Sequence, residues 1–341
     1  MSDHTVRCGG HITLLFSIWK DARLARFQGS RGAGFNVVDG VEATIRHIGT
    51  NEPSQPGVLS EGAGLDELPV EAKDGEIRLN VTSMDGTSIT HSTNLYTDLI
   101  EGLRGARLLN RAEAFNVEVT LGLPTSQGFG MSAAGLVAVA RAFHLHSGIG
   151  KDDQYLRIAH RIERLHSGGL GDVLGIAAGG VELRLEAGAP GAGGKAVGFE
   201  TDQPILLIWK PDESRHTSNY IDDEKWQLLI SNAGEMAVQA LRLKEWGPEV
   251  WPDLMLQARH FAQVSKLLDE EERNELNASV MDELRRLNLH SRVYVRLCML
   301  GVSLAILPRN LSEPLTREEI SVIANALREL QLGVRSTFIQ G

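Results

Sequence analysis

Alternating apolar and polar positions predict a strand near the start of the chain. Over residues 11–18 every even-numbered position is Ile, Leu or Phe, so these side chains would share one face of a strand. The glycine-dense segment 29–34 predicts a turn, and the apolar run over 35–41 with alternation up to residue 47 predicts a second strand. We therefore expect a β-hairpin in this region.

Strands and helices follow one another through the middle of the chain. Residues 49–75 are polar and carry scattered Gly, Pro, Ser and acidic residues, which predicts a long loop. Apolar residues at every second position predict strands at 77–81, 115–121 and 181–185. Apolar residues three or four positions apart predict helices over 92–109, 132–143 and 152–165.

Helical spacing of apolar residues dominates after residue 209. A glycine-rich connector at 188–194 precedes a short apolar strand at 205–209, so we expect a domain boundary near 190–203. One domain would cover residues 1–200 and the other residues 201–341. The last helix is expected to begin at the capping-box sequence Thr316–Glu319. Strands are expected only at the edges of the second domain, which would give it an α+β architecture.

The composition is typical of a soluble globular protein. A net charge of -10 and an isoelectric point near 5.6 argue against a general binder of nucleic acid or acidic membranes, so an anionic ligand would need a local site. The sequence has no apolar run of about 18 residues and no signal pattern at its start, and we expect a cytoplasmic location. Cys8 and Cys298 lie far apart without a CxxC spacing, so each is expected to be a reduced core residue.

One stretch, residues 123–135, carries the strongest chemical signal. An apolar strand is expected to pass there, through Gly128 and Gly130, into a helix that begins with small residues. Glycine lets the backbone approach an anion closely, and a helix N-terminus offers free N–H groups to negative charge. The pattern is that of a phosphate-binding loop. A strand-to-helix turn that needs glycine only for its geometry explains the same residues.

Three known loop types were weighed against this stretch. Its G-x-G-x-x-A pattern fits a dinucleotide fingerprint, but no strand precedes the acids at 152–153, where that fold needs one. The G-x-S-x-A pattern at 130–134 fits a nucleophile elbow, but loop residues intervene between the strand and the serine. A Walker loop needs a lysine, and none occurs between residues 80 and 150. A phosphate site here would be free of lysine.

The sequence PTSQGFGMSAAG resembles the second motif of the GHMP kinases, P-x-x-x-G-L-G-S-S-A-A, with Phe129 for leucine and Met131 for the first serine. Further resemblance, to the archaeal pantoate kinases of this superfamily, is carried by 10–13, 29–34, 168–173 and 299–301. The resemblance implies the GHMP kinase fold, an α+β architecture in which a ribosomal protein S5 domain 2-like N-terminal domain is joined to an α+β C-terminal domain. It covers little of 50–75 or 210–290.

The resemblance also implies an ATP site with Mg²⁺. Ser132 and Glu163 would be the metal ligands, and Asp172 would be the general base. Charges that flank an apolar stripe often pair locally, so Glu163 could instead pair with Arg161 or Arg164, and Asp172 could simply cap the next helix. Backbone N–H groups would hold the phosphates at Gly128, Phe129, Gly130, Met131, Ser132, Ala133 and Ala134.

The substrate residues implied by the resemblance come from the first two motifs. Arg31 would bind the pantoate carboxylate through two parallel hydrogen bonds, and Ser30 and His11 would hold its hydroxyls. A surface arginine in a hairpin is the simpler alternative for Arg31. The four histidines between 144 and 166 lack the spacing of a metal site and are expected on the surface or in packing.

The resemblance therefore implies an ATP-dependent kinase that phosphorylates the primary hydroxyl of pantoate to 4-phosphopantoate for coenzyme A synthesis. Another GHMP kinase, acting on mevalonate, homoserine or a sugar, is the alternative within the superfamily. A metabolite sensor that keeps the pocket but not the turnover is the alternative outside it, although the presence of Ser132, Glu163 and Asp172 together favours an enzyme. A homodimer and a monomer both fit the acidic composition.

Overall fold

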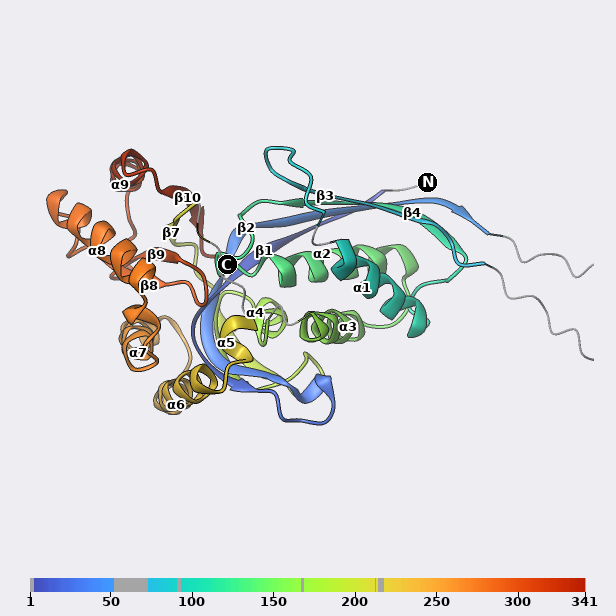
Figure 1. The fold of residues 1–341 in the computed structure, drawn as a ribbon, viewed down its shortest axis with the longest axis horizontal. Helices are drawn as coiled ribbons and strands as arrows, with labels where there is room; N and C mark the ends of the chain where they lie inside the picture. The colour runs from blue at the N-terminus through green and yellow to red at the C-terminus, as the bar shows by residue number, and fades with distance from the viewer. Residues whose placement is uncertain are drawn as a thin grey trace, which may run out of the picture.

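Two antiparallel-rich sheets organise the computed structural model, which describes residues 3–51, 73–90, 93–166, 169–211, 213 and 218–340 (Figure 1). The larger sheet has the order β3-β4-β2-β5-β6, with β1 paired to β2, and the smaller has the order β10-β7-β9-β8. The strands of the larger sheet are β1 (His4–Trp19), β2 (Gly29–Thr50), β3 (Ile77–Ser83), β4 (Glu113–Leu121), β5 (Val181–Glu186) and β6 (Lys195–Phe199).

The hairpin expected at the start of the chain is confirmed, because β1 and β2 pair antiparallel. The turn predicted at 29–34 is wrong, since these residues belong to β2 and the chain turns before them, around a short 3₁₀ helix at Ala25–Phe27. The glycines serve close packing instead. A Cβ at Gly32 would lie 2.3 Å from the Leu15 carbonyl oxygen, and one at Gly34 would lie 2.2 Å from that of Ile12.

Four helices cover one face of the larger sheet (Figure 1). They confirm the helices predicted over 92–109, 132–143 and 152–165, and the strands predicted at 77–81, 115–121 and 181–185 are also present. The central helix is buried along nearly its whole apolar length, as its small side chains led us to expect. The four helices are α1 (Thr93–Gly105), α2 (Met131–Ser147), α3 (Asp152–Leu165) and α4 (Asp172–Ala178).

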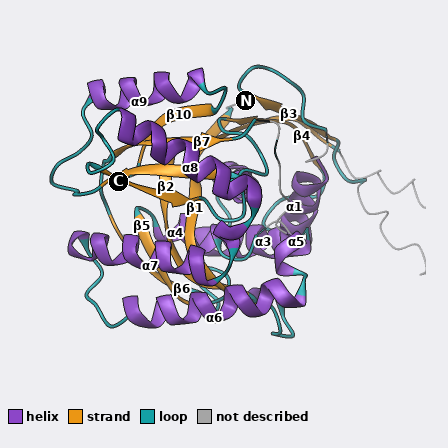
Figure 2. Ribbon diagram, turned by 60° about the vertical axis from the view of Figure 1, so that its left-hand side comes forward, coloured by secondary structure: helices purple, strands orange, loops and turns teal. Residues whose placement is uncertain are grey.

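The smaller sheet is formed by the second half of the chain and is covered by long helices (Figure 2). Strands were expected only at the edges of this half, but β9 lies inside the sheet between β7 and β8. Short apolar runs such as those of β8 and β9 cannot be told from pieces of a buried helix by periodicity alone. The strands are β7 (Pro204–Trp209), β8 (Val293–Leu297), β9 (Ser303–Pro308) and β10 (Gly333–Phe338).

The helices of the second half also tie the two sheets together. On α6, the Glu235 carboxylate accepts a hydrogen bond from Ser17 of β1, and a Cβ at Gly234 would lie 2.0 Å from the Phe16 carbonyl oxygen. The capping box at Thr316–Glu319 is present. The helices are α5 (Ser218–Ile221), α6 (Glu224–Leu241), α7 (Trp251–Val264), α8 (Glu271–Arg286) and α9 (Arg317–Glu329), with short 3₁₀ turns at Pro248–Val250 and Leu267–Asp269.

Several other expectations can be compared with the described residues. The larger sheet ends with β6 and the smaller begins with β7, on either side of residues 200–203; the division into two domains stays a prediction. Most of the loop predicted at 49–75 lies outside the described residues, as do Ser92 and Gly168. Cys8 and Cys298 are buried and free. Within the described ranges, no helix is long and apolar enough to cross a membrane.

A buried histidine gives the fold a dependence on pH. The imidazole of His160, on α3, is fully buried; its Nε2 donates to the Gln28 carbonyl oxygen at 2.9 Å, while Nδ1 has no partner among the described residues. Burial lowers the pKa of His160 to about 4, because removal from water disfavours the charged imidazolium. The neutral ring therefore stabilises the fold fully above its unfolded pKa near 6.5, and this contribution is lost as the pH falls toward 4.

We predict that His160→Gln flattens this pH dependence, because the glutamine amide can donate to Gln28 without titrating. Between pH 7 and 4.5 the free energy of unfolding of the wild type should fall by up to about 3 kcal/mol more than that of the variant. Urea unfolding at both pH values measures this difference. His260→Gln, at an exposed position on α7, is the control and should follow the wild type. The same slope for all three proteins would contradict the prediction.

Candidate active site

The loop between β4 and α2 has the backbone geometry of an anion-binding turn. Gly128 and Gly130 have φ angles of 73° and 66°, in the left-handed region that favours glycine. Gly130 is the N-cap of α2 and offers no side chain to the first turn, so the N–H groups of Met131 and Ser132 have no cap. The first N–H groups of a helix lack acceptors within the helix, so this end of α2 is suited to phosphate.

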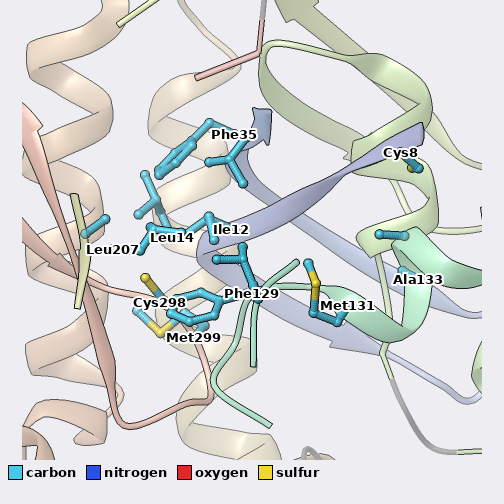
Figure 3. Packing of buried hydrophobic residues seen from close by; sticks show 14 of the residues in the cluster. Cys8, Ile12, Leu14, Phe35, Phe129, Met131, Ala133, Leu207, Cys298 and Met299 are labelled. Atoms are coloured by element: carbon cyan, nitrogen blue, oxygen red, sulfur yellow. The ribbon is translucent and has the colours of Figure 1, made fainter. Parts of the chain in front are cut away.

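Two segments that are distant in the sequence pack against this loop and fix its conformation. A Cβ at Gly128 would lie 2.7 Å from the Met299 carbonyl oxygen, so the motif at 299–301 packs directly against the loop. Figure 3 shows the Phe129 ring beside Cys298 and Met299. On the other side, the backbone N–H of His11 donates to the Phe129 carbonyl oxygen at 3.2 Å. The loop is therefore held between β1 and the C-terminal half.

Met131 and Ser132 point to different environments. The Met131 side chain is buried, and its Cε would lie 2.7 Å from a Cβ at Gly10 of β1. The methionine thus fills the space left by a glycine, and it belongs to the core rather than to the open side of the loop (Figure 3). Ser132 is exposed at the second position of the helix. Its hydroxyl is the only side-chain hydroxyl on the first turn of α2.

Asp172 lies at the first position of α4, and its carboxylate is held from β1. Its Oδ1 accepts hydrogen bonds from His11 Nδ1 at 2.7 Å and from Thr13 Oγ1 at 3.3 Å. The alternative that Asp172 only caps α4 is not what the structure shows, since the N-cap is Gly171 and no side chain caps the helix. About a quarter of the Asp172 side chain, 23%, remains exposed.

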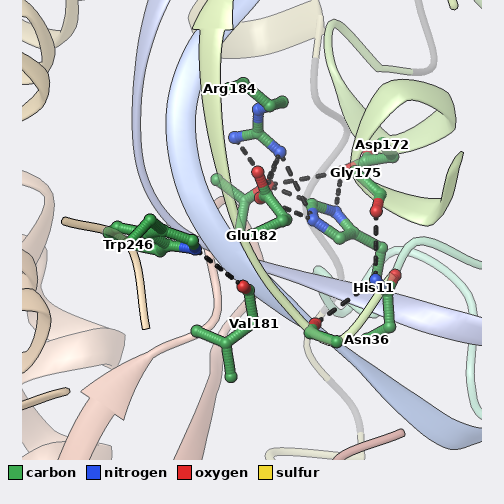
Figure 4. A network of polar contacts seen from close by, with 10 residues as sticks. His11, Asn36, Asp172, Gly175, Val181, Glu182, Arg184 and Trp246 are labelled. Carbon is green, nitrogen blue, oxygen red and sulfur yellow. Dashed lines mark hydrogen bonds and ion pairs between the residues drawn. The ribbon is translucent and has the colours of Figure 1, made fainter. Parts of the chain in front are cut away.

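A chain of buried charges continues behind Asp172 (Figure 4). His11 Nε2 lies 3.0 Å from Glu182 Oε1, which also accepts from Arg184 Nη1 at 3.0 Å. His11, Glu182 and Arg184 are fully buried, and the two cations share one carboxylate oxygen. A Cβ at Gly175 of α4 would lie 2.3 Å from His11 Nε2, so glycine there makes room for the imidazole.

The pKa values follow from these contacts. Burial alone would lower the pKa of His11, but the hydrogen bonds to Asp172 and Glu182 raise it above its ordinary value. His11 is therefore favoured as an imidazolium that donates from both ring nitrogens. Burial would raise the pKa of Asp172, but the hydrogen bond and charge of His11, with the charge of Arg184, lower it below its ordinary value. Asp172 is thus ionised near neutral pH.

Glu163 is a second carboxylate close to Asp172, and its pKa is shifted in the opposite direction. Burial, and then the charge of Asp172, raise the pKa of Glu163 to about 8. A Cβ at Gly169 would lie 2.3 Å from Glu163 Oε1 and 2.9 Å from Asp172 Oδ2, so the two carboxylates flank one small space. Arg164 donates to the Gly169 carbonyl oxygen at 2.8 Å rather than to Glu163, whose Oε2 has no partner among the described residues.

Ser30 and Arg31 lie next to each other on β2 but face different surroundings. Ser30 is buried under Gly171, where a Cβ would lie 2.2 Å from its Oγ. Arg31 is paired away from Asp172: its Nη2 lies 2.7 Å from Glu186 Oε2, its Nη1 lies 3.3 Å from Glu235 Oε2, and its guanidinium lies 4.2 Å from the centroid of the Trp19 ring.

A small cavity opens beside Asp172 and collects residues from four of the motifs found in the sequence. The described residues enclose about 40 Å³ here. Arg31 is not among the residues that line this space, and His11, with both ring nitrogens bound to carboxylates, has none left for a substrate hydroxyl. The lining residues that bear on the chemistry are Thr13, Ser30, Gly169, Gly171, Asp172 and Met299.

Sequence reasoning missed Thr13 as a partner of Asp172 and missed the pair Glu182 and Arg184 entirely. The alternation of β5, Val-Glu-Leu-Arg-Leu, predicted a strand and gave its two charged residues no role. In fact both charged side chains are buried under α4. Opposite charges two residues apart on one face of an otherwise apolar strand were the only available signal.

The four histidines of 144–166 behave as packing and surface residues. His144 stacks on Tyr155, His146 meets Phe115 edge to face, His160 is buried, and His166 pairs with Asp98. Across the described parts of the chain, no group of three or more His, Cys, Asp or Glu residues could hold a metal ion by itself.

The segment that carries the loop, Glu163 and Asp172 matches a known family. The family model described as the N-terminal domain of GHMP kinases aligns with residues 95–180. Residues 95–180 match the model of this domain, and they are about a quarter of the chain. The superfamily expected from the loop motif is therefore confirmed for this part of the chain.

Two curated relatives and one solved structure extend the comparison beyond residues 95–180. The pantoate kinase of Thermococcus kodakarensis is 37% identical over 145 residues, which are 42% of this chain and 46% of that protein. The chain thus matches about half the length of this relative. The pantoate kinase of Methanospirillum hungatei is 27% identical over 235 residues, 67% of this chain and 71% of that protein.

The solved structure is described as a phosphotransferase related to the coenzyme A biosynthesis pathway. It superposes with a TM-score of 0.73 over 99% of this chain and 96% of the other, at 23% identity. The superposition confirms the GHMP kinase fold for both halves of the chain.

Proposed function

We propose that this chain is an ATP-dependent kinase that phosphorylates the primary hydroxyl of pantoate to 4-phosphopantoate, a step toward coenzyme A. The observation that carries the proposal is the arrangement of Asp172, which is ionised, partly exposed and held by β1, the strand whose His11 backbone also anchors the phosphate loop. Two pantoate kinases among the relatives supply the substrate class. The same proposal places the enzyme in the cytoplasm.

The mechanism needs no covalent intermediate on the protein. The ATP phosphates would lie at the N-terminus of α2, and the substrate hydroxyl would lie next to Asp172. As its oxygen attacks the γ-phosphorus and the bond to the β-phosphate oxygen breaks, the hydroxyl proton passes to the carboxylate. Since His11 and Thr13 occupy Oδ1, the free oxygen Oδ2 is the one that accepts the proton.

The donor chemistry of Ser132 and Glu163 fits a Mg²⁺ ion. Glu163 offers a buried carboxylate oxygen, Oε2, without a partner in the described structure, and Ser132 offers an exposed hydroxyl. Oxygen ligands of this kind are those that Mg²⁺ prefers. When bound with ATP, the ion neutralises charge on the phosphates during transfer. Glu163 would hold it, and the charge of the ion would oppose the protonation that burial favours in its absence.

The substrate carboxylate has two candidate partners. Arg31 stays a candidate, but its ion pairs with Glu186 and Glu235 would have to open. Arg184 is fully buried and, like Arg31, does not line the cavity itself. We favour Arg184, because it contacts Thr13 and Gly171, two residues of the cavity wall, and its Nε is unpartnered among the described residues. Among the described residues, its guanidinium also has only one carboxylate partner, Glu182. A planar fork of this kind binds a carboxylate well.

Two other functions remain for the assay to separate. A GHMP kinase acting on mevalonate, homoserine or a sugar would use the same phosphate loop and base. A metabolite sensor would bind nucleotide without turnover. Both are less well supported, since the curated relatives reported above are pantoate kinases and the Asp172 site is complete.

We predict ATP-dependent phosphorylation of pantoate by the purified protein with Mg²⁺, and not of mevalonate, homoserine or galactose. Asp172→Asn should lower kcat by about 10²- to 10⁴-fold, because the proton acceptor is lost. Coupled measurement of ADP release and mass analysis of the product give both results. Asp202→Asn, an exposed loop change of equal charge, is the control. Turnover of another alcohol in preference to pantoate, or full activity of Asp172→Asn, would sink the proposal.

A pair of His11 variants tests whether the imidazole positions Asp172. An asparagine amide can reach the place of Nδ1 and donate to Asp172, whereas a glutamine amide can reach the place of Nε2 and donate to Glu182. We therefore expect His11→Gln to lose about 100-fold in kcat and His11→Asn to lose about tenfold, with similar KM for ATP.

Melting temperatures of both His11 variants serve as the control for folding, because each leaves one buried carboxylate short of a donor. If kcat falls by the same factor in both variants and both are equally stable, then the hydrogen bond from His11 to Asp172 does not account for the effect of His11 on catalysis.

The two arginine candidates are separated by their effect on pantoate. We predict that Arg184→Lys raises the KM for pantoate by about tenfold or more while the KM for ATP stays within about twofold, because lysine keeps the charge but loses the fork. Arg31→Lys, the matched change, should leave the KM for pantoate within about twofold. Steady-state kinetics measure all four values. If Arg31→Lys raises the KM for pantoate and Arg184→Lys does not, Arg31 is the residue that binds the substrate carboxylate.

A further inference from the structure

A second cavity lies in the C-terminal half, away from Asp172. It encloses about 380 Å³ between α7, α8 and the edge strand β8, with Arg309 from the end of β9 at its rim. Figure 1 shows α7 and α8 on either side of β8, on the part of the molecule that lies beyond the larger sheet. None of its lining residues takes part in the site described above.

The lining of this cavity is strongly cationic. Four arginines line it, Arg259, Arg285, Arg296 and Arg309, together with His290; all of these arginines except Arg296 are exposed. None of the described residues that line the cavity is acidic. The chain as a whole carries a net charge of -10, so this concentration of positive charge runs against the composition.

Three of these arginines have no carboxylate partner in the described structure. Arg296 donates only to backbone carbonyls, those of Met255 and Val295, at 2.8 Å and 2.7 Å. No ion pair is found for Arg259 or Arg309 within the described ranges. Arg285 is the exception, since it pairs with the exposed Asp282 at 2.6 Å. The positive charge of the cavity is therefore largely uncompensated.

Tyr294 holds two of the guanidiniums in place. Those of Arg296 and Arg309 lie 4.8 Å and 5.0 Å from the centroid of its ring. Burial lowers the pKa of Arg296 to about 10, and the charges of Arg259 and Arg309 add to the effect, as expected for like charges held close together. Binding of an anion would offset this repulsion.

We propose that this cavity, which we call the arginine cavity, is a binding site for a small phosphorylated molecule with two or more anionic groups. The volume is within the range of small-molecule sites, roughly 300–1,000 Å³. Guanidinium forks match phosphate oxygens in pairs, and a phosphate group carries roughly 1.5 to 2 negative charges near neutral pH, so two such groups would balance the three arginines that lack a carboxylate partner among the described residues. Gln263 of α7 and Asn277 of α8 also line the cavity, and their side-chain amides offer further hydrogen bonds.

The test is a binding measurement on the full-length protein and does not depend on its catalytic activity. Pyrophosphate is titrated calorimetrically into the wild type, into Arg259→Gln/Arg309→Gln, and into Arg317→Gln/Arg328→Gln. The last pair changes the net charge equally at exposed positions of α9. Pyrophosphate bound at the phosphate loop is common to all three proteins, so the difference between them reports the arginine cavity. Melting temperatures confirm that each variant is folded.

We expect the Arg259/Arg309 variant to lose a binding event, or to bind about tenfold or more weakly at it, and the α9 variant to match the wild type. Equal binding by the two double variants, including no binding by any protein, would overturn the proposal.

Two further titrants test the chemical class of the ligand. Citrate should bind more weakly than pyrophosphate at the arginine cavity. Tighter binding of citrate would mean that the site prefers carboxylates to phosphates, which would contradict the proposal. A ten-residue oligoglutamate should not compete with pyrophosphate. If it binds more tightly and depends on the same two arginines, the site is a docking surface for an acidic protein segment, and the small-molecule proposal fails.

Discussion

The position of His11 is the constraint on which the rest of the candidate site depends. Its backbone N–H anchors the phosphate loop at Phe129, and its ring binds Asp172 on one side and Glu182 on the other. One residue of β1 thus fixes the distance between the place for phosphate and the base. An imidazolium can do this because it donates from both ring nitrogens, and its burial keeps these charged hydrogen bonds out of water, where they are stronger.

The glycines around the site are explained by the close packing that this arrangement needs. Gly175 leaves room for the imidazole, Gly130 brings the loop against the His11 backbone, and Gly169 leaves the space between Glu163 and Asp172 open. In each case a Cβ would meet an atom at less than 3.0 Å. The loop also depends on the C-terminal half, because Gly128 packs against the Cys298 and Met299 carbonyls. The proposed phosphate site is therefore formed by both halves of the chain.

Two carboxylates in one small space have different environments, and this difference separates their roles. Asp172 is ionised because His11 and Arg184 lie beside it, whereas Glu163 is buried next to that negative charge and its pKa is raised. A carboxylate that is ionised and partly exposed suits proton transfer, and one that is buried with an unpartnered oxygen suits a cation. The arginine cavity shows the converse case, in which uncompensated positive charge is held in place by Tyr294.

The sequence alone determined most elements of the fold and the loop at 123–135, because periodicity and glycine spacing are local properties of the chain. The candidates Ser132, Glu163 and Asp172 came from the resemblance of its motifs to those of the GHMP kinases. The sequence did not determine that 29–34 is a strand. The glycines there are needed because Gly32 and Gly34 pack against the carbonyl oxygens of Leu15 and Ile12 on the neighbouring strand, and that contact exists only in the folded chain. Sequence reasoning also assigned His11 to substrate and missed Glu182 and Arg184. Pairing of buried charges from β1, α4 and β5 depends on which strands become neighbours, and only the tertiary structure decides that.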